Sequence, residues 1–278
     1  MQPPKGYCIY CGKKANSKEH LYAAWLEAYV PHLLPYRIHF SSENIIDFRK
    51  RVIVTGPVKK SIKPGSVNSH RLKIVCRECN GGWMGKLQER AKPHIIKLLQ
   101  NDWSISSPES RNSIAAWATM FVMNVEFKDR KTVCISTADR AYLMKNGAAP
   151  RNWGVAIGIY NGSTNVGFSH VPLKIIEHEK EGSLECWDKS ATDVSFQAQY
   201  TVFIVGSLIF LTFSARHNHY QLFNLFHDIC HQYDLYICTE SSNVPSGIPL
   251  TIHNDDGANE ISKSFLPPGQ RKLLRNLV

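Results

Sequence analysis

Two pairs of cysteines in the first third of the chain have the spacing of metal ligands. Each pair is a C-x-x-C motif, formed first by Cys8 and Cys11 and much later by Cys76 and Cys79. Four thiolates saturate a Zn²⁺ ion in tetrahedral geometry and leave no open coordination position for a substrate. The spacing therefore predicts a structural zinc site, and any catalytic chemistry must come from residues near these ligands.

Three polar residues beside the cysteines can do acid–base or metal chemistry. Glu19 and His20 lie between the two pairs, and Asn80 directly follows the last cysteine. A histidine ionises near neutral pH and can deprotonate water, whereas carboxylate and amide oxygens suit a hard ion such as Mg²⁺ or Mn²⁺. Simpler alternatives stay open: Glu19 and His20 can form a surface pair or a helix cap, and Asn80 a helix N-cap.

Positive charge is concentrated in the segment that carries these motifs. Residues 1–100 hold 18 Lys and Arg against 6 Asp and Glu, a net charge of +12, whereas residues 101–278 hold 15 against 17, a net of −2. Solvated surface lysines would not be sorted in this way, so we expect a nucleic-acid partner for the first segment and another role for the second. The residues expected to contact phosphate are Lys59, Lys60 and Lys63 in a basic loop, Arg71, Lys86 and Arg90. For the last two, a solvated helix face is an equal alternative.

The pattern of apolar residues predicts an α+β protein with a domain boundary at 101–107, which gives domains 1–104 and 105–278. Helices are expected at 21–30 and 81–100, then at 108–125 with Ser107 as N-cap, at 137–147 and at 220–233. Strands are expected at 36–40, 44–48, 51–55, 72–75, 155–160, 165–170, 194–196 and 201–213. Residues 58–66, rich in turn formers, are expected to form the exposed basic loop.

Composition excludes some classes of protein. Of the 278 residues, 43% are hydrophobic and 20% charged, which is typical of a folded globular chain. The longest apolar run, 202–213, is shorter than the roughly 20 residues of a membrane helix, so it predicts a buried strand and no membrane partner. The N-terminus lacks an apolar signal region, so we expect a cytoplasmic protein. The other cysteines, expected as reduced thiols, are Cys134, Cys186, Cys230 and Cys238.

A histidine cluster near the C-terminus has metal-ligand spacing but not the matching motif. His227 and His231 are four positions apart on an expected helix, and His217 and His219 come shortly before. Zinc proteases need Glu after the first histidine, where this chain has Asp228. We therefore interpret these histidines as buried or surface side chains.

The order of motifs in residues 7–92 resembles that of the zinc-stabilised HNH (ββα-metal) endonucleases. The matching segments are Ser17-Lys18-Glu19-His20-Leu21 and Cys76-Arg77-Glu78-Cys79-Asn80-Gly81-Gly82-Trp83-Met84. The resemblance implies two strands and a helix that present His20 as general base and Asn80 as ligand of a catalytic Mg²⁺ or Mn²⁺ ion. Glu19 would orient His20 or assist in binding the metal.

The chain departs from the family pattern in two ways. The gap between His20 and Cys76 is longer than in compact members, which indicates an insertion, and the central signature residue is either Asn68 or His70. Without that residue, a zinc-stapled nucleic-acid-binding module that does not cleave becomes the alternative. By family analogy we expect cleavage of double-stranded DNA, a homodimer, a role in antiviral defence or phage conflict, and a small-molecule or protein trigger acting on residues 105–278.

Overall fold

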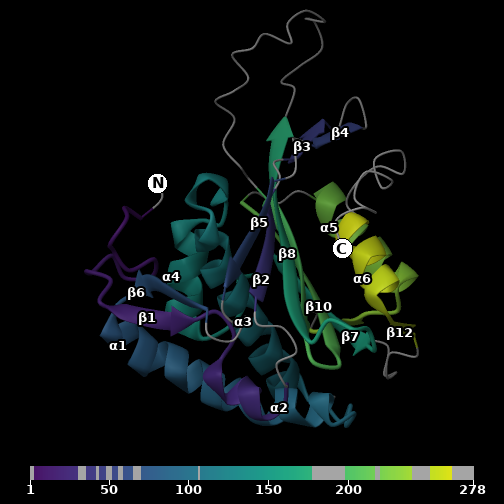
Figure 1. The fold of residues 1–278 in the computed structure, drawn as a ribbon, viewed down its shortest axis with the longest axis horizontal. Helices are drawn as coiled ribbons and strands as arrows, with labels where there is room; N and C mark the ends of the chain where they lie inside the picture. Colours follow the sequence, from purple (N-terminus) through teal and green to yellow (C-terminus); the bar gives the residue numbers. More distant parts are fainter. Residues whose placement is uncertain are drawn as a thin grey trace, which may run out of the picture.

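The computed structural model describes residues 3–30, 36–41, 44–47, 52–55, 59–64, 70–105, 107–176, 198–216, 220–239 and 251–264. It has a mixed α+β fold, as predicted, in which a large sheet lies between two groups of helices (Figure 1). A smaller two-stranded sheet lies beside the first group of helices and carries the motif residues. None of the helices described is long and apolar enough to cross a membrane.

The large sheet combines strands from distant parts of the chain. Its order among the described strands is β11-β7-β10-β9-β8-β3-β4, and β12 also pairs with β7. Their bounds are β3 (Asn44–Asp47), β4 (Val52–Thr55), β7 (Trp153–Tyr160), β8 (Val166–Ile176), β9 (Ala198–Val205), β10 (Leu208–Ala215), β11 (Tyr236–Ile237) and β12 (Ile252–His253). The central pairs β7–β10, β10–β9 and β9–β8 are antiparallel, whereas β3 joins β8 in parallel.

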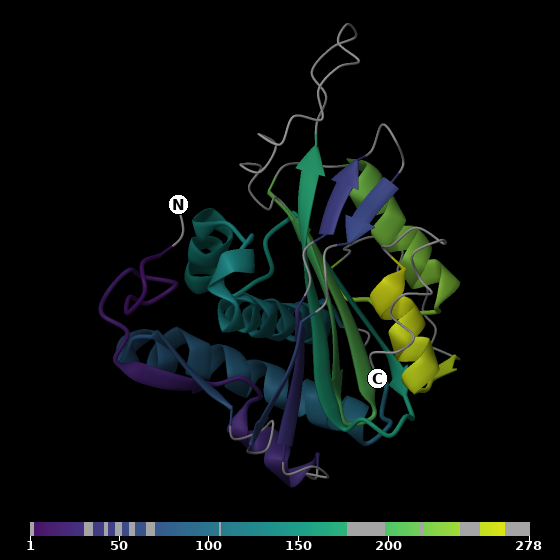
Figure 2. The same cartoon turned by 45° about the horizontal axis from the view of Figure 1, so that its top comes forward.

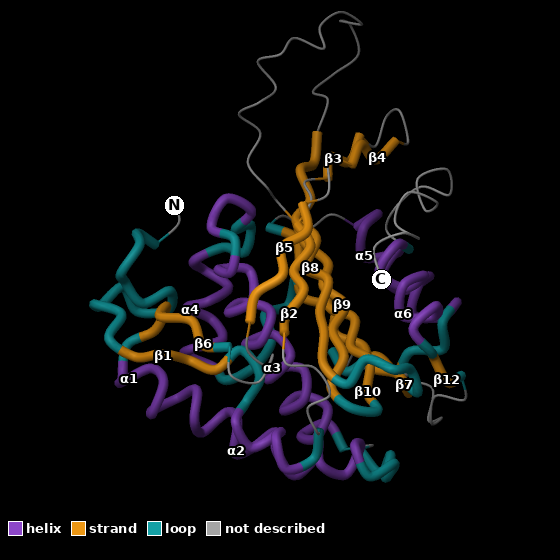
Figure 3. Tube along the Cα trace, viewed as in Figure 1, coloured by secondary structure: helices purple, strands orange, loops and turns teal. Residues whose placement is uncertain are grey.

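Helices cover both faces of this sheet, as the trace in Figure 3 shows. Those on the first face are α2 (Gly85–Leu99), α3 (Pro108–Val125) and α4 (Thr137–Asn146), and those on the second are α5 (Tyr220–Gln232) and α6 (Asp255–Lys263). Two short turns, η3 (Glu126–Lys128) and η4 (Arg130–Thr132), link α3 to α4. Side chains alternate along each strand. Phe203 therefore stacks on Phe121 of α3 at a ring-centroid distance of 4.2 Å, while Leu211 packs with α5 and α6.

The apolar run at 202–213 forms a hairpin rather than the single strand predicted. The chain reverses between β9 and β10 at Gly206, whose φ of +57° is in the left-handed region that favours glycine. Both strands are buried on both faces, so the sequence reads as one continuous apolar stretch. The single glycine that separates them was the signal for the turn.

The small sheet and the helix after it position the motif residues. Strands β1 (Ser17–His20) and β6 (Arg71–Val75) pair antiparallel, although His20 and Arg71 are 51 positions apart. The chain then continues through α1 (Arg77–Cys79) and a wide turn, η2 (Asn80–Met84), into α2. Figure 2 shows β1 running alongside this helix. The backbone leaves helical geometry at Gly82, so the break in the helix lies there.

The segment between β1 and β6 is the one predicted to be an insertion, and two of its predicted elements are wrong. The expected helix at 21–30 is only the short turn η1 (Ala24–Ala28), and the expected basic loop at 58–66 contains a strand, β5 (Lys59–Pro64). That strand pairs with β2 (Tyr36–Ser41), while β3 and β4 add to the edge of the large sheet. The strands predicted at 36–40, 44–48 and 51–55 are confirmed as β2, β3 and β4.

One hydrophobic cluster contains residues from both sides of the predicted domain boundary. Leu87 and Ile95 of α2 are buried with Trp117 and Phe121 of α3. Helix α3 begins as predicted, because the Ser107 hydroxyl accepts a 3.1 Å hydrogen bond from the N–H of Ser110. The division at 101–107 stays a prediction, and the shared core holds the motif segment firmly against the sheet.

Candidate metal centre and active site

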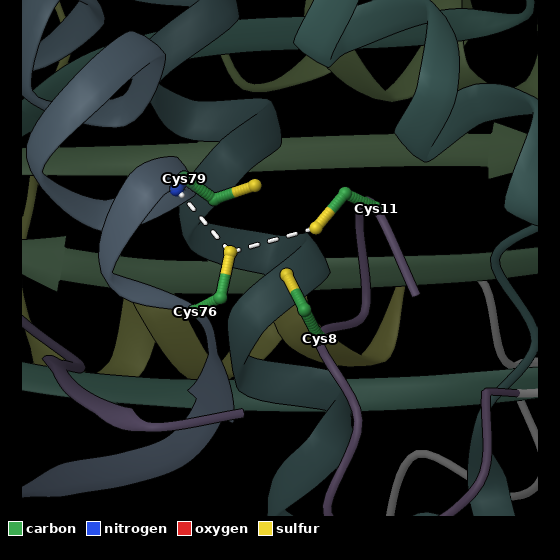
Figure 4. Close-up of side chains that lie close together, drawn as sticks. All are labelled: Cys8, Cys11, Cys76 and Cys79. Atoms are coloured by element: carbon green, nitrogen blue, oxygen red, sulfur yellow. Dashed lines mark hydrogen bonds between the residues drawn. The ribbon is translucent and has the colours of Figure 1, made fainter. Parts of the chain in front are cut away.

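The four predicted zinc ligands converge on one point. The sulfurs of Cys8, Cys11, Cys76 and Cys79 all lie within 4.8 Å of one another and face a common centre (Figure 4). A Zn–S distance of about 2.3 Å in a tetrahedral site separates the sulfurs by about 3.8 Å, and Cys11 Sγ lies 3.5 Å from Cys76 Sγ. The tetrad therefore fits a structural zinc ion.

Local backbone hydrogen bonds shape both cysteine knuckles. The N–H of Gly12 donates to the carbonyl of Cys8 at 3.0 Å, and Gly12 has a φ of +74°, which closes the first turn tightly. In the second knuckle, the N–H of Cys79 donates to Cys76 Sγ at 3.4 Å (Figure 4). The N–H of Ile9 also donates to the carbonyl of Ile74 in β6, so the first knuckle is attached to the second strand.

Burial disfavours the ionised form of two of the four thiols. Desolvation raises the pKa of Cys76 to about 11 and also raises the pKa of Cys79, whereas for the exposed Cys11 hydrogen bonds outweigh desolvation and lower the pKa. Four thiolates packed together need a divalent ion to offset their charge and their desolvation. Zinc binding must displace thiol protons, so affinity for zinc rises with pH.

The alternation of β1 places Glu19 and His20 on opposite faces. Glu19 lies opposite Leu72 of β6 and is only 6% exposed, because its face of the small sheet lies against the helix. His20 lies opposite Arg71 on the outer face and is half-buried. Since side chains at successive strand positions point in opposite directions, the dipeptide presents a carboxylate inward and an imidazole outward.

Glu19 and Asn80, the two predicted ligands of the catalytic metal, lie together. The Glu19 carboxylate accepts a 3.2 Å hydrogen bond from Gln88 Nε2 and is also in hydrogen-bonding contact with the Asn80 amide. Asn80 Nδ2 donates to Ser17 Oγ at 2.8 Å. Burial raises the pKa of Glu19 to about 7, against the opposing effect of these hydrogen bonds.

Asn80 does not serve as an N-cap. The helix begins at Arg77, and Cys76 occupies the capping position with its own sulfur. The alternative interpretation of Asn80 is therefore wrong. Its side chain instead reaches across to β1.

His20 is held by Arg71. Arg71 Nε donates to His20 Nε2 at 2.7 Å, so Nε2 is the nitrogen with the lone pair and the proton of the neutral ring is on Nδ1. Burial lowers the pKa of His20, the Arg71 charge lowers it further, and Glu27 acts in the opposite direction. The imidazole is therefore neutral at physiological pH, which is the form a general base requires.

The remaining predicted site residues have varied positions. His70 precedes β6, and its carbonyl accepts a 2.8 Å hydrogen bond from the N–H of Leu21, whereas Asn68 lies outside the described residues. Lys86 is exposed on α2. Arg90 is exposed on the same helix but donates to the carbonyl of Gly147 after α4. The backbone of Lys59, Lys60 and Lys63 lies in β5, and the structure does not describe their side chains.

Sequence reasoning missed Ser17 and Gln88, the hydrogen-bond partners of Asn80 and Glu19. Both had a signal in the spacing. Ser17 is two positions before Glu19, so it shares a face with it in a strand. Gln88 is eight positions after Asn80, about two turns along a helix of 3.6 residues per turn. Each could be found only once β1 was known to lie against that helix.

A second group of potential ligands is formed by Glu126, Cys134 and His170. Glu126 already accepts backbone hydrogen bonds from Cys134 at 3.0 Å and from Ile135 at 3.1 Å, and it forms a fully buried ion pair with Arg140. A divalent ion here would lie beside the Arg140 charge. We therefore interpret this group as a structural polar cluster that joins α3 to α4.

The histidine pair at His227 and His231 lies on α5, as predicted. Neither belongs to a close group of metal-ligand atoms in the part of the chain that the structure describes. His217 and His219 lie outside that part, as does Cys186. Cys134, Cys230 and Cys238 are buried free thiols, as expected.

The substitution Glu19→Gln is expected to increase stability above neutral pH. Because burial raises the pKa of Glu19 from 4.5 to about 7, the folded state holds this proton more tightly than the unfolded state, and the free energy of unfolding decreases as pH rises from about 4.5 to 7. Gln does not ionise. The free energy of unfolding of the variant should therefore exceed that of the wild type by about 1–3 kcal/mol at pH 8 and by little at pH 5. Denaturation without added Mg²⁺ at both pH values measures this.

Glu89→Gln on the exposed side of α2 is the matched control. It should leave the pH dependence of unfolding unchanged. If Glu19→Gln changed the free energy of unfolding equally at pH 5 and pH 8, the result would contradict the assignment of a buried, titrating carboxylate.

The chain matches no protein-family model, no curated protein and no solved structure. The resemblance to HNH endonucleases therefore rests on the motif residues of the sequence.

Proposed function

We propose that the chain is a metal-dependent endonuclease of the HNH type, which hydrolyses phosphodiester bonds in double-stranded DNA. One observation carries the proposal: Asn80, after β6, donates to Ser17 of β1 at 2.8 Å, next to Glu19, which accepts from Gln88 at 3.2 Å. His20 follows Glu19 along the strand and points to the opposite face. These residues are far apart in sequence, and a strand pair followed by a helix brings them together. The order of elements is the one that the family resemblance implies.

Two oxygen ligands are available for a catalytic cation. The Asn80 amide nitrogen donates to Ser17 and is the group that faces the Glu19 carboxylate. The amide oxygen accepts no hydrogen bond among the described residues, and it would join the carboxylate at a cation after rotation of the amide. Two protein ligands are enough for Mg²⁺ or Mn²⁺, which keep several waters and bind substrate phosphates. When bound, such an ion would neutralise charge on the phosphate and on the leaving 3′-oxygen.

His20 would act as the general base. Its imidazole is neutral, but its Nε2 lone pair accepts the hydrogen bond from Arg71 Nε in this structure. It would take the proton of the attacking water once Arg71 releases that bond. The zinc tetrad would have no chemical role in the step. It would fix the turn before Asn80 to the segment before β1, because Cys79 and Cys8 contribute to the same centre.

A second function, nucleic-acid binding without cleavage, is favoured by the charge of residues 1–100, which needs no His20 to attract a polyanion. Binding that persists in the absence of divalent ions, together with intact DNA in Mg²⁺ and Mn²⁺, would identify this function.

The biological setting stays a prediction. It includes a cytoplasmic role in antiviral defence, a homodimer that cuts both strands, and a small-molecule or protein trigger acting through residues 105–278. A nuclease with little sequence preference must be controlled, and the second part of the chain is the candidate for that control.

Replacing Asn80 tests the proposed metal ligand. Asn80→Ala removes the amide oxygen and should raise the Mg²⁺ concentration for half-maximal cleavage at least about 10- to 100-fold, the loss typical when even an outer partner of a metal site is removed. Asn80→Asp keeps an oxygen ligand and should retain Mg²⁺-dependent cleavage. Cleavage rates across a Mg²⁺ series for both variants, at equal thermal stability, measure this. An unchanged Mg²⁺ requirement in Asn80→Ala would remove this residue from the site.

A further inference from the structure

The outer face of the small sheet carries the candidate base together with three cations. Residues directly opposite each other in an antiparallel pair share a face, as do residues two apart along a strand. His20 lies opposite Arg71. The register of the pair shifts between Ser17 and Glu19, and exposure identifies the other members of the face. Lys18 and Lys73, each two positions from His20 or Arg71, are exposed, as is Arg71, whereas Glu19 and Ile74 are buried. Glu19 points to the opposite face, so the β1–β6 ribbon presents no carboxylate beside them.

These cations are not neutralised locally. Among the residues that the structure describes, none of Lys18, Arg71 and Lys73 takes part in an ion pair. Glu27, which lies outside the ribbon, raises the pKa of His20 by its charge, against the larger lowering effects of burial and Arg71. Three exposed like charges on a strip two strands wide create a positive potential that attracts a polyanion rather than an isolated carboxylate.

Arg71 is suited to contact two groups at once. A guanidinium has five N–H donors in a planar fork, and the bond to His20 uses only the one on Nε. Within the described part of the chain, the Arg71 side chain makes no other hydrogen bond, which leaves the four N–H groups on its terminal nitrogens. These groups match the oxygens of a phosphate in bidentate geometry.

We propose that the outer face of the β1–β6 ribbon, defined by Lys18, Arg71 and Lys73, binds the phosphate backbone of nucleic acid, with Arg71 making the contact nearest to His20. The position of Arg71 relative to the cleaved phosphate rests on the proposed nuclease function. Binding to the face does not, because counterion release requires no catalysis. Arg71 would then connect substrate binding to the general base through one side chain.

The test compares two triple variants with the same change in net charge. The ribbon variant carries Lys18→Gln, Arg71→Gln and Lys73→Gln. The control variant carries Lys131→Gln, Lys145→Gln and Arg151→Gln, all exposed residues outside the small sheet. Fluorescence anisotropy of a labelled DNA duplex, over a salt series without added divalent ions, gives the slope of log K against log salt concentration. Each lost phosphate contact should reduce the magnitude of that slope by about 0.9, so the ribbon variant should lose about 2–3 and the control almost nothing.

The proposal would be overturned if both triple variants lost the same amount of the salt slope. It would also be overturned if DNA binding by the wild-type protein did not depend on salt. The result is separable from the nuclease function. A wild-type protein that binds through this face but never cleaves would leave the surface intact and refute the nuclease. A wild-type protein that cleaves DNA, together with a ribbon variant that binds DNA as the wild type does, would refute the surface and leave the nuclease function intact.

Arg71→Lys is a second variant that keeps the charge but not the planar fork. It should preserve the salt slope while it slows DNA cleavage by at least about 10-fold, since Lys cannot hold His20 and a phosphate in fixed geometry. Cleavage at the wild-type rate would remove Arg71 from the vicinity of the cleaved phosphate.

Discussion

Replacing Cys76 by Ser is expected to abolish zinc binding and to destabilise the protein severely. Cys76 is a buried member of the tetrad, and its sulfur also accepts a hydrogen bond from the N–H of Cys79. A structural zinc ion contributes on the order of 10 kcal/mol in small domains, and here the packing of α2 against α3 offsets part of the loss. We expect the thermal midpoint to fall by more than about 10 °C, since 1 kcal/mol corresponds to about 2–4 °C in a chain of 150–250 residues.

The control is Cys134→Ser, a buried thiol outside the tetrad. It should retain one zinc per chain, measured by elemental analysis of the purified protein, even where it lowers stability. Two zinc ions in wild type and one in Cys134→Ser would instead identify the group of Glu126, Cys134 and His170 as a second metal site. One zinc ion per chain in Cys76→Ser would contradict the assignment of the four cysteines as zinc ligands.

The second large effect is expected for His20→Ala. General acid–base catalysis contributes roughly 10²–10⁴-fold to rate, so cleavage of a DNA duplex in Mg²⁺ should fall by that factor. The ring is half-buried and its side-chain hydrogen bond comes from the exposed Arg71, so the unfolding midpoint should change little. Single-turnover cleavage rates and thermal unfolding of the same preparations measure both quantities.

His231→Ala is the matched control for this variant, because His231 is exposed on α5. It should cleave at the wild-type rate. A His20→Ala protein that cleaves as fast as His231→Ala would refute the assignment of the general base while leaving the zinc centre unaffected.

The metal tetrad could be predicted from the sequence because its chemistry depends on local spacing. A C-x-x-C knuckle is short, and the distance between two knuckles does not matter once zinc joins them. Helix boundaries with a local signal were also predicted, such as the Ser107 cap and the end of α4 at Gly147, whose φ is +59°. The strand before the second knuckle was predicted from its apolar alternation.

Features that depend on long-range pairing could not be predicted in the same way. Nothing local indicates that β3 and β4, in the insertion, extend the sheet built by residues 153–215. The turn formers at 58–66 favour a loop by composition, yet pairing with β2 makes a strand of Lys59–Pro64. The roles of Ser17 and Gln88 likewise required the contact between β1 and the helix after β6, which unites residues 69 positions apart.

The most direct test of the proposed function is incubation of the purified, zinc-loaded wild-type protein with supercoiled plasmid, in Mg²⁺, in Mn²⁺ and without divalent ions. The arrangement of Glu19, Asn80 and His20 predicts nicked and linear DNA in the presence of either ion and intact plasmid without one. Intact plasmid in every condition, from protein that contains its zinc and binds the DNA, would contradict the nuclease and favour a zinc-stapled binding protein.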